Sequence, residues 1–429
     1  MNFLKSFSFT FLTKAFSIVA LLLCRILLAR LLGPSELGSL GNALNLTTLF
    51  ARWSSLGTVP ATQFVAAKHA GSRNEILTIT MVSSVILSIS GLLFVYLLSP
   101  HIVTWQFGND TFGKEIFEQL IPFLPIVILS MTLPINLLGQ GDYKAYSTSQ
   151  IVPLIIQTSL LGFAFMSTNP VQIVIAGQIT YWILMAVISL LKNRVHSFHL
   201  SVNSKIATDY IRMALKMFPL VILQYSLARL PVLAGSHYLS TKELGYFILA
   251  SNLSEAFLIL YTAITPIIFN RTLKSRSCPI FLIKVICYSG ALMLIILILV
   301  LTSGGFVFLY LFGERYLPSW RLLQLLSPTI LLHGIFTLSV NHFVAIEKTT
   351  TVICTYLAGI LTLAISCILF CPAYGVIGLC YSSILSALAT ALICIFLVRK
   401  ESNTTLNTLL LSAKEDWHKL INKQFERDN

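Results

Sequence analysis

The chain has few charged residues and no long stretch of soluble composition. Only 10% of its 429 residues are Asp, Glu, Lys or Arg, whereas a soluble globular domain has about 25%. The apolar runs also lack the alternation of apolar and polar positions that marks the strands of an outer-membrane barrel. These absences exclude an ordinary soluble domain, two soluble domains with separate cores, and a membrane barrel.

The sequence likewise lacks the usual marks of a metal centre, a disulfide framework or an enzyme. Its eight cysteines include no Cys-x-x-Cys pair, and most lie inside apolar runs. It contains no Asp-x-Asp pair, glycine-rich phosphate loop or nucleophile elbow. We therefore predict no cofactor, no metal site and no catalytic residues, so the protein is not expected to be an enzyme. We also expect no cleavable signal peptide.

Long apolar runs are abundant. Hydrophobic residues make up 56% of the chain, and twelve membrane crossings of about 20 residues each would use a similar share. The sequence predicts an all-α polytopic membrane protein with about twelve transmembrane helices in two six-helix lobes. The expected spans are 10–32, 36–59, 76–99, 118–140, 146–167, 171–191, 214–238, 243–267, 281–303, 320–345, 351–371 and 375–398.

These spans divide the chain into four parts. Residues 1–195 are expected to form the N-terminal lobe with helices 1–6, and 196–213 a cytoplasmic connector. Residues 214–400 are expected to form the C-terminal lobe with helices 7–12. The tail, 401–429, carries apolar residues at helical spacing. It is interpreted as an amphipathic helix on the inner leaflet, or alternatively as a solvated helix packed on the protein.

Positive charge is unevenly distributed between the two sides of the membrane. The chain has 29 Lys and Arg and a net charge of +13. Four of the 29 fall in far-side loops and five within or at the ends of spans, which leaves twenty on the side of the N-terminus. The far-side residues are Lys114, Lys242, Arg315 and Arg321. Because cytoplasmic loops collect Lys and Arg, both termini are predicted to be cytoplasmic, and nucleic acid is not needed as a partner.

A short motif recurs at a fixed offset. Glu36-Leu37-Gly38 returns 207 residues later as Glu243-Leu244-Gly245, and at that offset Asn45 pairs with Asn252. An offset of six spans predicts a parallel repeat, and transporters built from such halves bind substrate at the interface between them. The alternative is a chance similarity between two amphipathic hairpins.

Several basic residues lie inside the predicted spans. Lys14 and Arg25 share one face of the first span, Arg52 shares a face with Asn45 on the second, and Arg229 follows Tyr225 by one turn on the seventh. An arginine at mid-membrane costs roughly 2.5–3.5 kcal/mol, so it should face protein or water. We predict that these residues, with Asn252, line a cationic cavity between the lobes. The alternative is that they reach the membrane surface through their long side chains.

Glu255 is the one acid clearly inside a predicted span, the eighth, three residues after Asn252. It either pairs with a cation or takes up H⁺ or Na⁺ and couples transport to an ion gradient. Three aromatic residues, Trp105, Tyr316 and Trp320, are expected near the far-side boundary as part of an interfacial belt.

Three junctions between spans resemble those of a known family. They are Arg30-Leu-Leu-Gly-Pro-Ser-Glu-Leu-Gly38, Leu311-Phe-Gly-Glu-Arg-Tyr-Leu-Pro-Ser319 and Pro372-Ala-Tyr-Gly-Val-Ile-Gly378. In order and spacing they resemble the O-antigen/polysaccharide flippase (Wzx) family of the multidrug/oligosaccharidyl-lipid/polysaccharide exporter superfamily. The resemblance covers all twelve spans, with one departure at Leu37, where the family often has an aromatic residue.

The resemblance implies a MATE-like bundle in the bacterial inner membrane. It would move an undecaprenyl-diphosphate-linked oligosaccharide from the cytoplasmic to the periplasmic leaflet by alternating access. The implied partners are this substrate, the lipid bilayer, an H⁺ or Na⁺ counter-ion, a glycan polymerase and a chain-length regulator. The basic residues named above would then bind the diphosphate.

Three alternatives remain at this stage. A small-molecule or drug exporter of the same superfamily would need acidic residues for cationic drugs. A lipid II-type flippase is weakly disfavoured by twelve spans instead of fourteen. A membrane glycan polymerase or glycosyltransferase would usually need a large far-side loop or metal-binding carboxylates.

Overall fold

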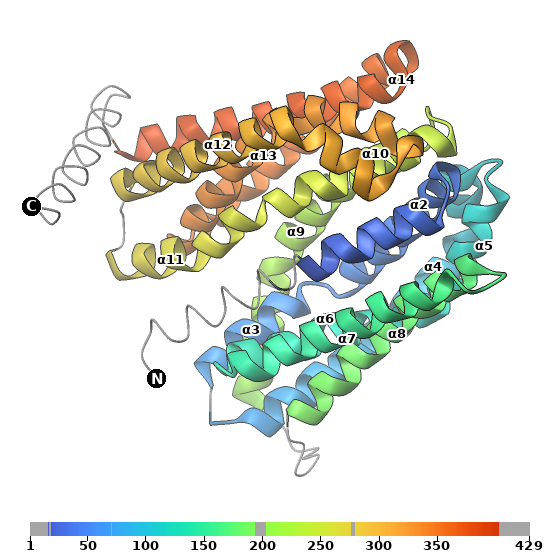
Figure 1. Ribbon diagram of the computed structural model, residues 1–429. Helices are drawn as coiled ribbons and strands as arrows, with labels where there is room; N and C mark the ends of the chain where they lie inside the picture. Colours follow the sequence, from blue (N-terminus) through green and yellow to red (C-terminus); the bar gives the residue numbers. More distant parts are fainter. Residues whose placement is uncertain (1–15, 17–18, 70, 194–202, 276–278, 403–429) are drawn as a thin grey trace, which may run out of the picture.

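The computed structural model describes residues 16, 19–69, 71–193, 203–275 and 279–402. All regular secondary structure in these residues is helical, and the helices form two lobes (Figure 1). The all-α, two-lobed fold predicted from the sequence is therefore confirmed. Lys14 and nearly all of the predicted 401–429 tail lie outside the described residues.

The helices of the two lobes follow one another along the chain. The N-terminal lobe contains a helix over 19–31, α2 (Pro34–Ser54), α3 (Thr58–Lys68), α4 (Arg73–Phe107), α5 (Thr111–Leu120), α6 (Leu124–Gly139), α7 (Tyr143–Ala164) and α8 (Pro170–Lys192). The C-terminal lobe contains α9 (Ser204–Gly235), α10 (Thr241–Phe257), α11 (Ile259–Ser275), α12 (Pro279–Phe312), α13 (Leu317–Ala345) and α14 (Thr349–Ser402).

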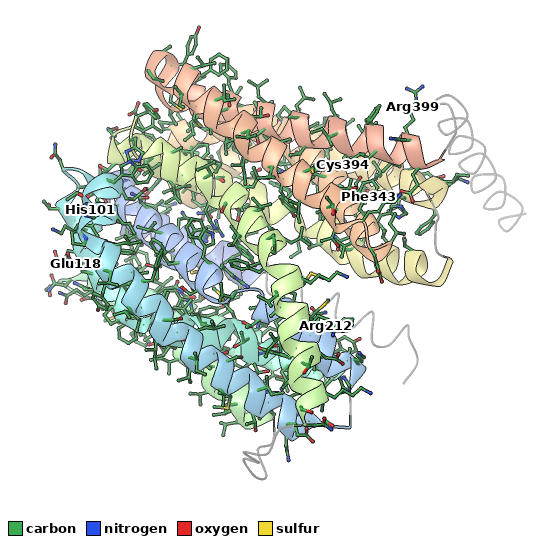
Figure 2. All side chains as sticks on the ribbon, turned by 180° about the vertical axis from the view of Figure 1, so that it is seen from behind. His101, Glu118, Arg212, Phe343, Cys394 and Arg399 are labelled. Carbon is green, nitrogen blue, oxygen red and sulfur yellow. The ribbon has the colours of Figure 1, made fainter. Side chains whose placement is uncertain are left out.

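We name the two ends of the bundle from their turns. The distal end holds the turns at Gly33, Gly108 and Gly313, and the proximal end holds the turns at 140–142 and 346–348. Figure 2 shows His101 and Glu118 at the distal end, with Arg212 and Arg399 toward the other.

Eight helices in the described part of the chain are long and apolar enough to cross a membrane. One of these, α14, contains the two predicted spans 351–371 and 375–398, which fold back on each other at Gly375 (φ 57°). The three predicted spans outside these eight correspond to the helix over 19–31, to α2 with α3, and to α7. All three are helical. Helices α2 and α7 contain many polar residues, and only thirteen residues of the first helix, 19–31, form a continuous described stretch.

Proline and glycine interrupt two of the predicted spans. Around Pro122 the fourth span changes from α5 through a 3₁₀ turn (Ile121–Phe123) into α6, because proline cannot donate to the preceding helical turn. The second span bends between α2 and α3 at Leu56 and Gly57, both of which have positive φ. A Cβ atom on Gly57 would overlap the Ala214 carbonyl oxygen of α9. Glycine at this position therefore allows both the positive φ of the turn and the close packing against α9.

The two lobes meet where α2 crosses α10. A Cβ on Gly38 would overlap the carbonyl oxygen of Thr241, and a Cβ on Gly245 would overlap that of Pro34. These two contacts exchange under the 207-residue offset, so the repeated motif forms a pseudo-two-fold joint. Each helix also begins alike, since Glu36 accepts from the Gly33 N–H (2.8 Å) and Glu243 from the Ser240 N–H (3.0 Å).

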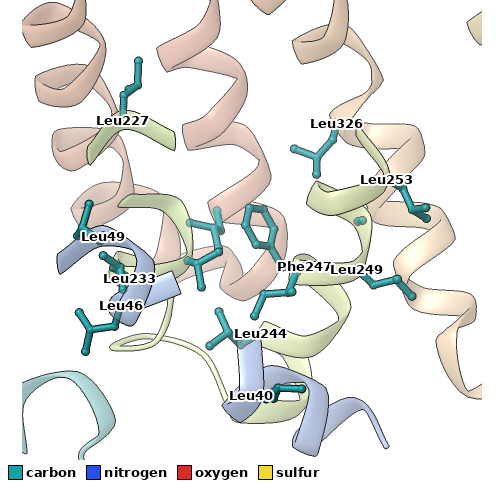
Figure 3. Packing of buried hydrophobic residues seen from close by; sticks show 14 of the residues in the cluster. Leu40, Leu46, Leu49, Leu227, Leu233, Leu244, Phe247, Leu249, Leu253 and Leu326 are labelled. Carbon is teal, nitrogen blue, oxygen red and sulfur yellow. The ribbon is translucent and has the colours of Figure 1, made fainter. Parts of the chain in front are cut away.

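The hydrophobic core is continuous across this joint. Leu40 and Leu46 of α2 belong to the same buried cluster as Leu233 of α9 and Phe247 of α10 (Figure 3). The N-terminal part of α9 instead packs with α3 and α4 in a separate small cluster that contains Tyr210. Helix α9 therefore contacts the N-terminal lobe near its start and packs with helices of both lobes further along.

The close contact at Gly38 predicts how adding one methyl group there changes the stability of the protein. Gly38→Ala should lower the melting temperature of the purified protein, because overpacking a well-packed site costs typically about 1–3 kcal/mol. The matched control is Gly290→Ala in α12, where a Cβ meets no atom within 4 Å. That change should be neutral or slightly stabilising, since alanine favours helices by roughly 0.5–1 kcal/mol over glycine. Tryptophan fluorescence during heating gives the melting temperatures. Equal melting temperatures for the two variants would contradict a direct backbone contact between α2 and α10.

Candidate functional site between the lobes

Arg52 lies in the last turn of α2, where that helix faces α9. Its guanidinium carbon is 4.3 Å from the centre of the Tyr225 ring, which is a cation–π contact between the lobes. The Nε atom of Arg52 is buried and has no hydrogen-bond partner among the described residues. The side chain is thus held in place by an aromatic face and keeps hydrogen-bonding capacity unused.

Arg229 follows Tyr225 by one turn on the same face of α9. Its Nη1 atom lies 3.5 Å from Oε1 of Glu255 on α10. The Arg229 side chain is 28% exposed and that of Glu255 is 44% exposed, so this ion pair is open on one side. The plain pairing of Glu255 that was weighed from the sequence is present in the structure.

Arg25, on the helix over 19–31, is the third cation of the site. It is half-buried, is attracted by the charge of Glu255 and is repelled by that of Arg229. Arg229 also acts on Arg52. We call Arg25, Arg52, Arg229 and Glu255 the cationic cluster. Its members come from four helices, two in each lobe.

The cationic cluster has more positive than negative charge. It contains three guanidinium groups and one carboxylate, which leaves a surplus of two positive charges. Arginine presents several N–H donors in a planar fork that suits phosphate oxygens. An arrangement of this kind can bind a dianionic group that enters between the lobes.

The remaining predicted site residues differ in their surroundings and contacts. Asn45 is half-buried and donates its amide N–H to the Gly41 carbonyl oxygen of its own helix (2.8 Å). Asn252 is half-buried on α10, one turn from Glu255. Lys14 lies outside the described residues, so its place in the site stays a prediction.

The sequence did not predict the hydrogen bonds that join the two lobes at the distal end. Arg30 begins the first family-like junction, and its Nε donates to the Leu311 carbonyl oxygen (2.8 Å) and its Nη2 to that of Tyr310. The Tyr316 hydroxyl donates back to the Leu32 carbonyl oxygen (3.0 Å). The only sequence signal was that these residues fall in two of the three family-like junctions.

The expected aromatic belt is wrong for two of its three members. Tyr316 is completely buried and Trp320 is 8% exposed, whereas Trp105 is exposed. Tyr316 packs edge-on against Tyr246, and Trp320 packs against Phe308. Aromatic residues near a span end were expected at the lipid boundary, but two of them are buried in the protein core, Tyr316 against the other lobe and Trp320 against α12 of its own lobe.

Comparisons with solved structures show which known proteins share this fold. The chain superposes on a lipid II flippase MurJ in an inward closed conformation with a TM-score of 0.72 and 12% identity, over 99% of this chain and 93% of the other. An inward-facing multidrug resistance MATE family transporter of the MOP superfamily gives 0.71 and 14%, over 90% and 94%. An outward-facing MATE transporter gives 0.58 and 15%, over 92% and 94%. The chain therefore shares its fold with a lipid II flippase and with MATE transporters.

The family follows from the sequence itself. A family model described as "Polysaccharide biosynthesis protein" matches residues 27–321, which is more than half of the chain. The chain belongs to this family and is a multi-pass membrane protein. The family resemblance inferred from its three junctions is thereby confirmed. A search of curated proteins finds no match.

The geometry of the Arg229–Glu255 pair predicts a weak coupling. Partly exposed ion pairs contribute about 0–1 kcal/mol, so Arg229→Gln and Glu255→Gln should show a coupling energy of that size in a double-mutant cycle. The control cycle uses the exposed pair Lys114 and Glu118, whose charged atoms are 3.9 Å apart, and should give no measurable coupling. Melting temperatures of the single and double variants provide the measurement. Equal couplings in both cycles would contradict a distinct cluster around Glu255.

Proposed function

We propose that this protein is a flippase for undecaprenyl-diphosphate-linked oligosaccharide, such as an O-antigen repeat unit. It would move this substrate from the cytoplasmic to the periplasmic leaflet of the bacterial inner membrane. The observation that carries the proposal is the cationic cluster at the lobe interface, with its surplus of two positive charges. Membership of the polysaccharide biosynthesis family and the transporter fold support it.

Each part of the substrate has different physical needs. The diphosphate is dianionic and would bind Arg25, Arg52 and Arg229, together with Lys14 if that residue reaches the site. The glycan is polar and would remain in the water-accessible space between the lobes, near Asn45 and Asn252. The lipid tail needs no protein shelter, because it can stay in the bilayer while the head group crosses.

The closed distal end suggests how transport proceeds. The Gly38–Gly245 joint and the Arg30 and Tyr316 contacts hold the lobes together there. The chain also superposes better on the two structures described as inward than on the outward-facing one. We infer an inward-facing state in which the proximal end and both termini are cytoplasmic. Alternating access would then require the distal contacts to break and proximal contacts to form.

A lipid II flippase is the second candidate, favoured by the superposition on MurJ. The cationic cluster would suit any lipid-linked diphosphate, so the glycan must decide between the two. A drug exporter fits less well, since a net positive site repels cationic drugs. Purified protein in proteoliposomes can be offered lipid II and a lipid-linked oligosaccharide separately, and faster flipping of lipid II would transfer the proposal to the second candidate.

The cationic cluster should be essential for transport but not for folding. Arg25→Gln and Arg52→Gln should each reduce flipping in proteoliposomes by about tenfold or more, since one charge-assisted hydrogen bond is worth about 1.5–3 kcal/mol. The matched control is Arg321→Gln, which alters an exposed arginine on α13. In cells, the two cluster variants should insert normally but lose surface glycan and accumulate lipid-linked units inside. Full-length surface glycan from both would refute the proposed role of the cluster.

The role of Glu255 is tested by ion gradients. If its carboxylate takes up H⁺ or Na⁺ during the cycle, Glu255→Gln should flip substrate at a rate that no longer depends on either gradient, because the amide cannot be charged. The wild-type protein under collapsed gradients provides the reference. Wild-type dependence on both gradients in the variant would remove Glu255 from coupling and leave it as the partner of Arg229.

A further inference from the structure

A polar cavity lies at the distal end, and no member of the cationic cluster lines it. It has a volume of about 490 Å³, within the range of about 300–1,000 Å³ typical of small-molecule sites. Its walls come from α2 and the α4–α5 turn on one side and from the α9–α10 turn on the other. Both lobes therefore contribute to this cavity, which we call the distal pocket.

Gln106 organises the wall of the distal pocket. Its side chain is 2% exposed, and Nε2 donates to Asn42 Oδ1 (2.8 Å), Ser236 Oγ (2.8 Å) and the Leu233 carbonyl oxygen (3.3 Å). These bonds join the N-terminal lobe to the end of α9. The Oε1 atom of Gln106 is buried and has no donor among the described residues. An acceptor left in this condition costs free energy that a hydroxyl donor would recover.

Aromatic and acidic groups complete the lining. The Trp105 ring is 64% exposed, and its centre lies 4.1 Å from that of the His237 ring across the lobe boundary. Asp110 accepts from the Gly113 N–H through one carboxylate oxygen (2.9 Å). Trp105 lines this polar cavity together with His237. An apolar ring face beside amide, hydroxyl and carboxylate groups matches a ligand with one face of C–H groups and a rim of hydroxyls.

We propose that the distal pocket binds a neutral hexopyranose residue. Its C–H face would pack on Trp105, and its hydroxyls would bond with Asp110 and, after a small side-chain shift, with Gln106. The lining of this pocket holds Asp110 but neither Lys nor Arg, so it does not suit a phosphate. The choice of a sugar rests on the proposed function, and the pocket would hold part of the glycan on the side where it is delivered. Because its walls come from both lobes, a bound sugar would stabilise the closed distal end.

The test uses neutral methyl glycosides, which carry neither lipid nor phosphate. Methyl glucoside, methyl galactoside and methyl N-acetylglucosaminide are titrated against the full-length protein in lipid nanodiscs, with glycerol as the polyol control. Saturation-transfer NMR gives binding and the dissociation constant. At least one glycoside should bind the wild-type protein, whereas glycerol should not.

Variants then locate the binding. Gln106→Leu and Trp105→Leu should each weaken glycoside binding by about tenfold or more. Gln119→Leu, the same substitution at an exposed position of neighbouring α5, should leave it unchanged. Trp105 is exposed, so its variant keeps the test valid even if Gln106→Leu fails to fold. Lack of binding by all three glycosides, or equal binding by the Trp105 variant and the wild type, overturns the proposal.

A last variant separates this proposal from the proposed function. The double variant Arg25→Gln/Arg52→Gln should bind the glycosides as the wild type does, although it should not transport. Loss of glycoside binding in it would place the sugar at the cationic cluster and overturn the distal pocket. Normal transport by the cluster variants with intact glycoside binding would refute only the proposed role of the cluster.

Discussion

The arrangement depends on two helices that approach each other without side chains between them. At Gly38 and Gly245 the backbones of α2 and α10 are so close that a single methyl group has no room. This contact sets the distance between the lobes at the distal end and the position of everything further along both helices. Arg52 lies about four turns along α2 from Gly38, and Glu255 about three turns along α10 from Gly245. Closing the joint therefore brings these two charges to the same interface.

The electrostatics of the interface explain why that position is useful. Three guanidinium groups and one carboxylate would be costly in hydrocarbon, but at the lobe interface they meet an aromatic face, an opposite charge and an open side. The carboxylate compensates only part of the positive charge. A protein that needed the cluster only for stability would gain more from balanced pairs or from apolar packing. The unbalanced charge fits a site that is completed by an anionic ligand.

The sequence allowed much of the fold to be predicted, and less of the site. The apolar runs predicted the helices, and the Glu-Leu-Gly repeat predicted the two lobes, because both are patterns in one dimension. Arg25, Arg52 and Arg229 could be grouped since an arginine inside a span must find protein or water. The partner of Arg52, the fastening by Arg30 and the burial of Tyr316 could not be derived, because each depends on which helix lies opposite. The distal pocket was missed for the same reason, as Gln106 and Ser236 are 130 residues apart.

The repeat is symmetrical in its joint but not in its charges. The 207-residue offset relates Gly38 to Gly245 and Asn45 to Asn252, so the contacts that close the lobes appear twice. The same offset relates Arg52 to Ile259, Arg25 to Val232, and Glu255 to Thr48. A joint that must open and close benefits from symmetry, since both lobes then separate along equivalent surfaces. A diphosphate with lipid at one end and sugar at the other has no such symmetry, and a site that recognises it must differ between the two halves.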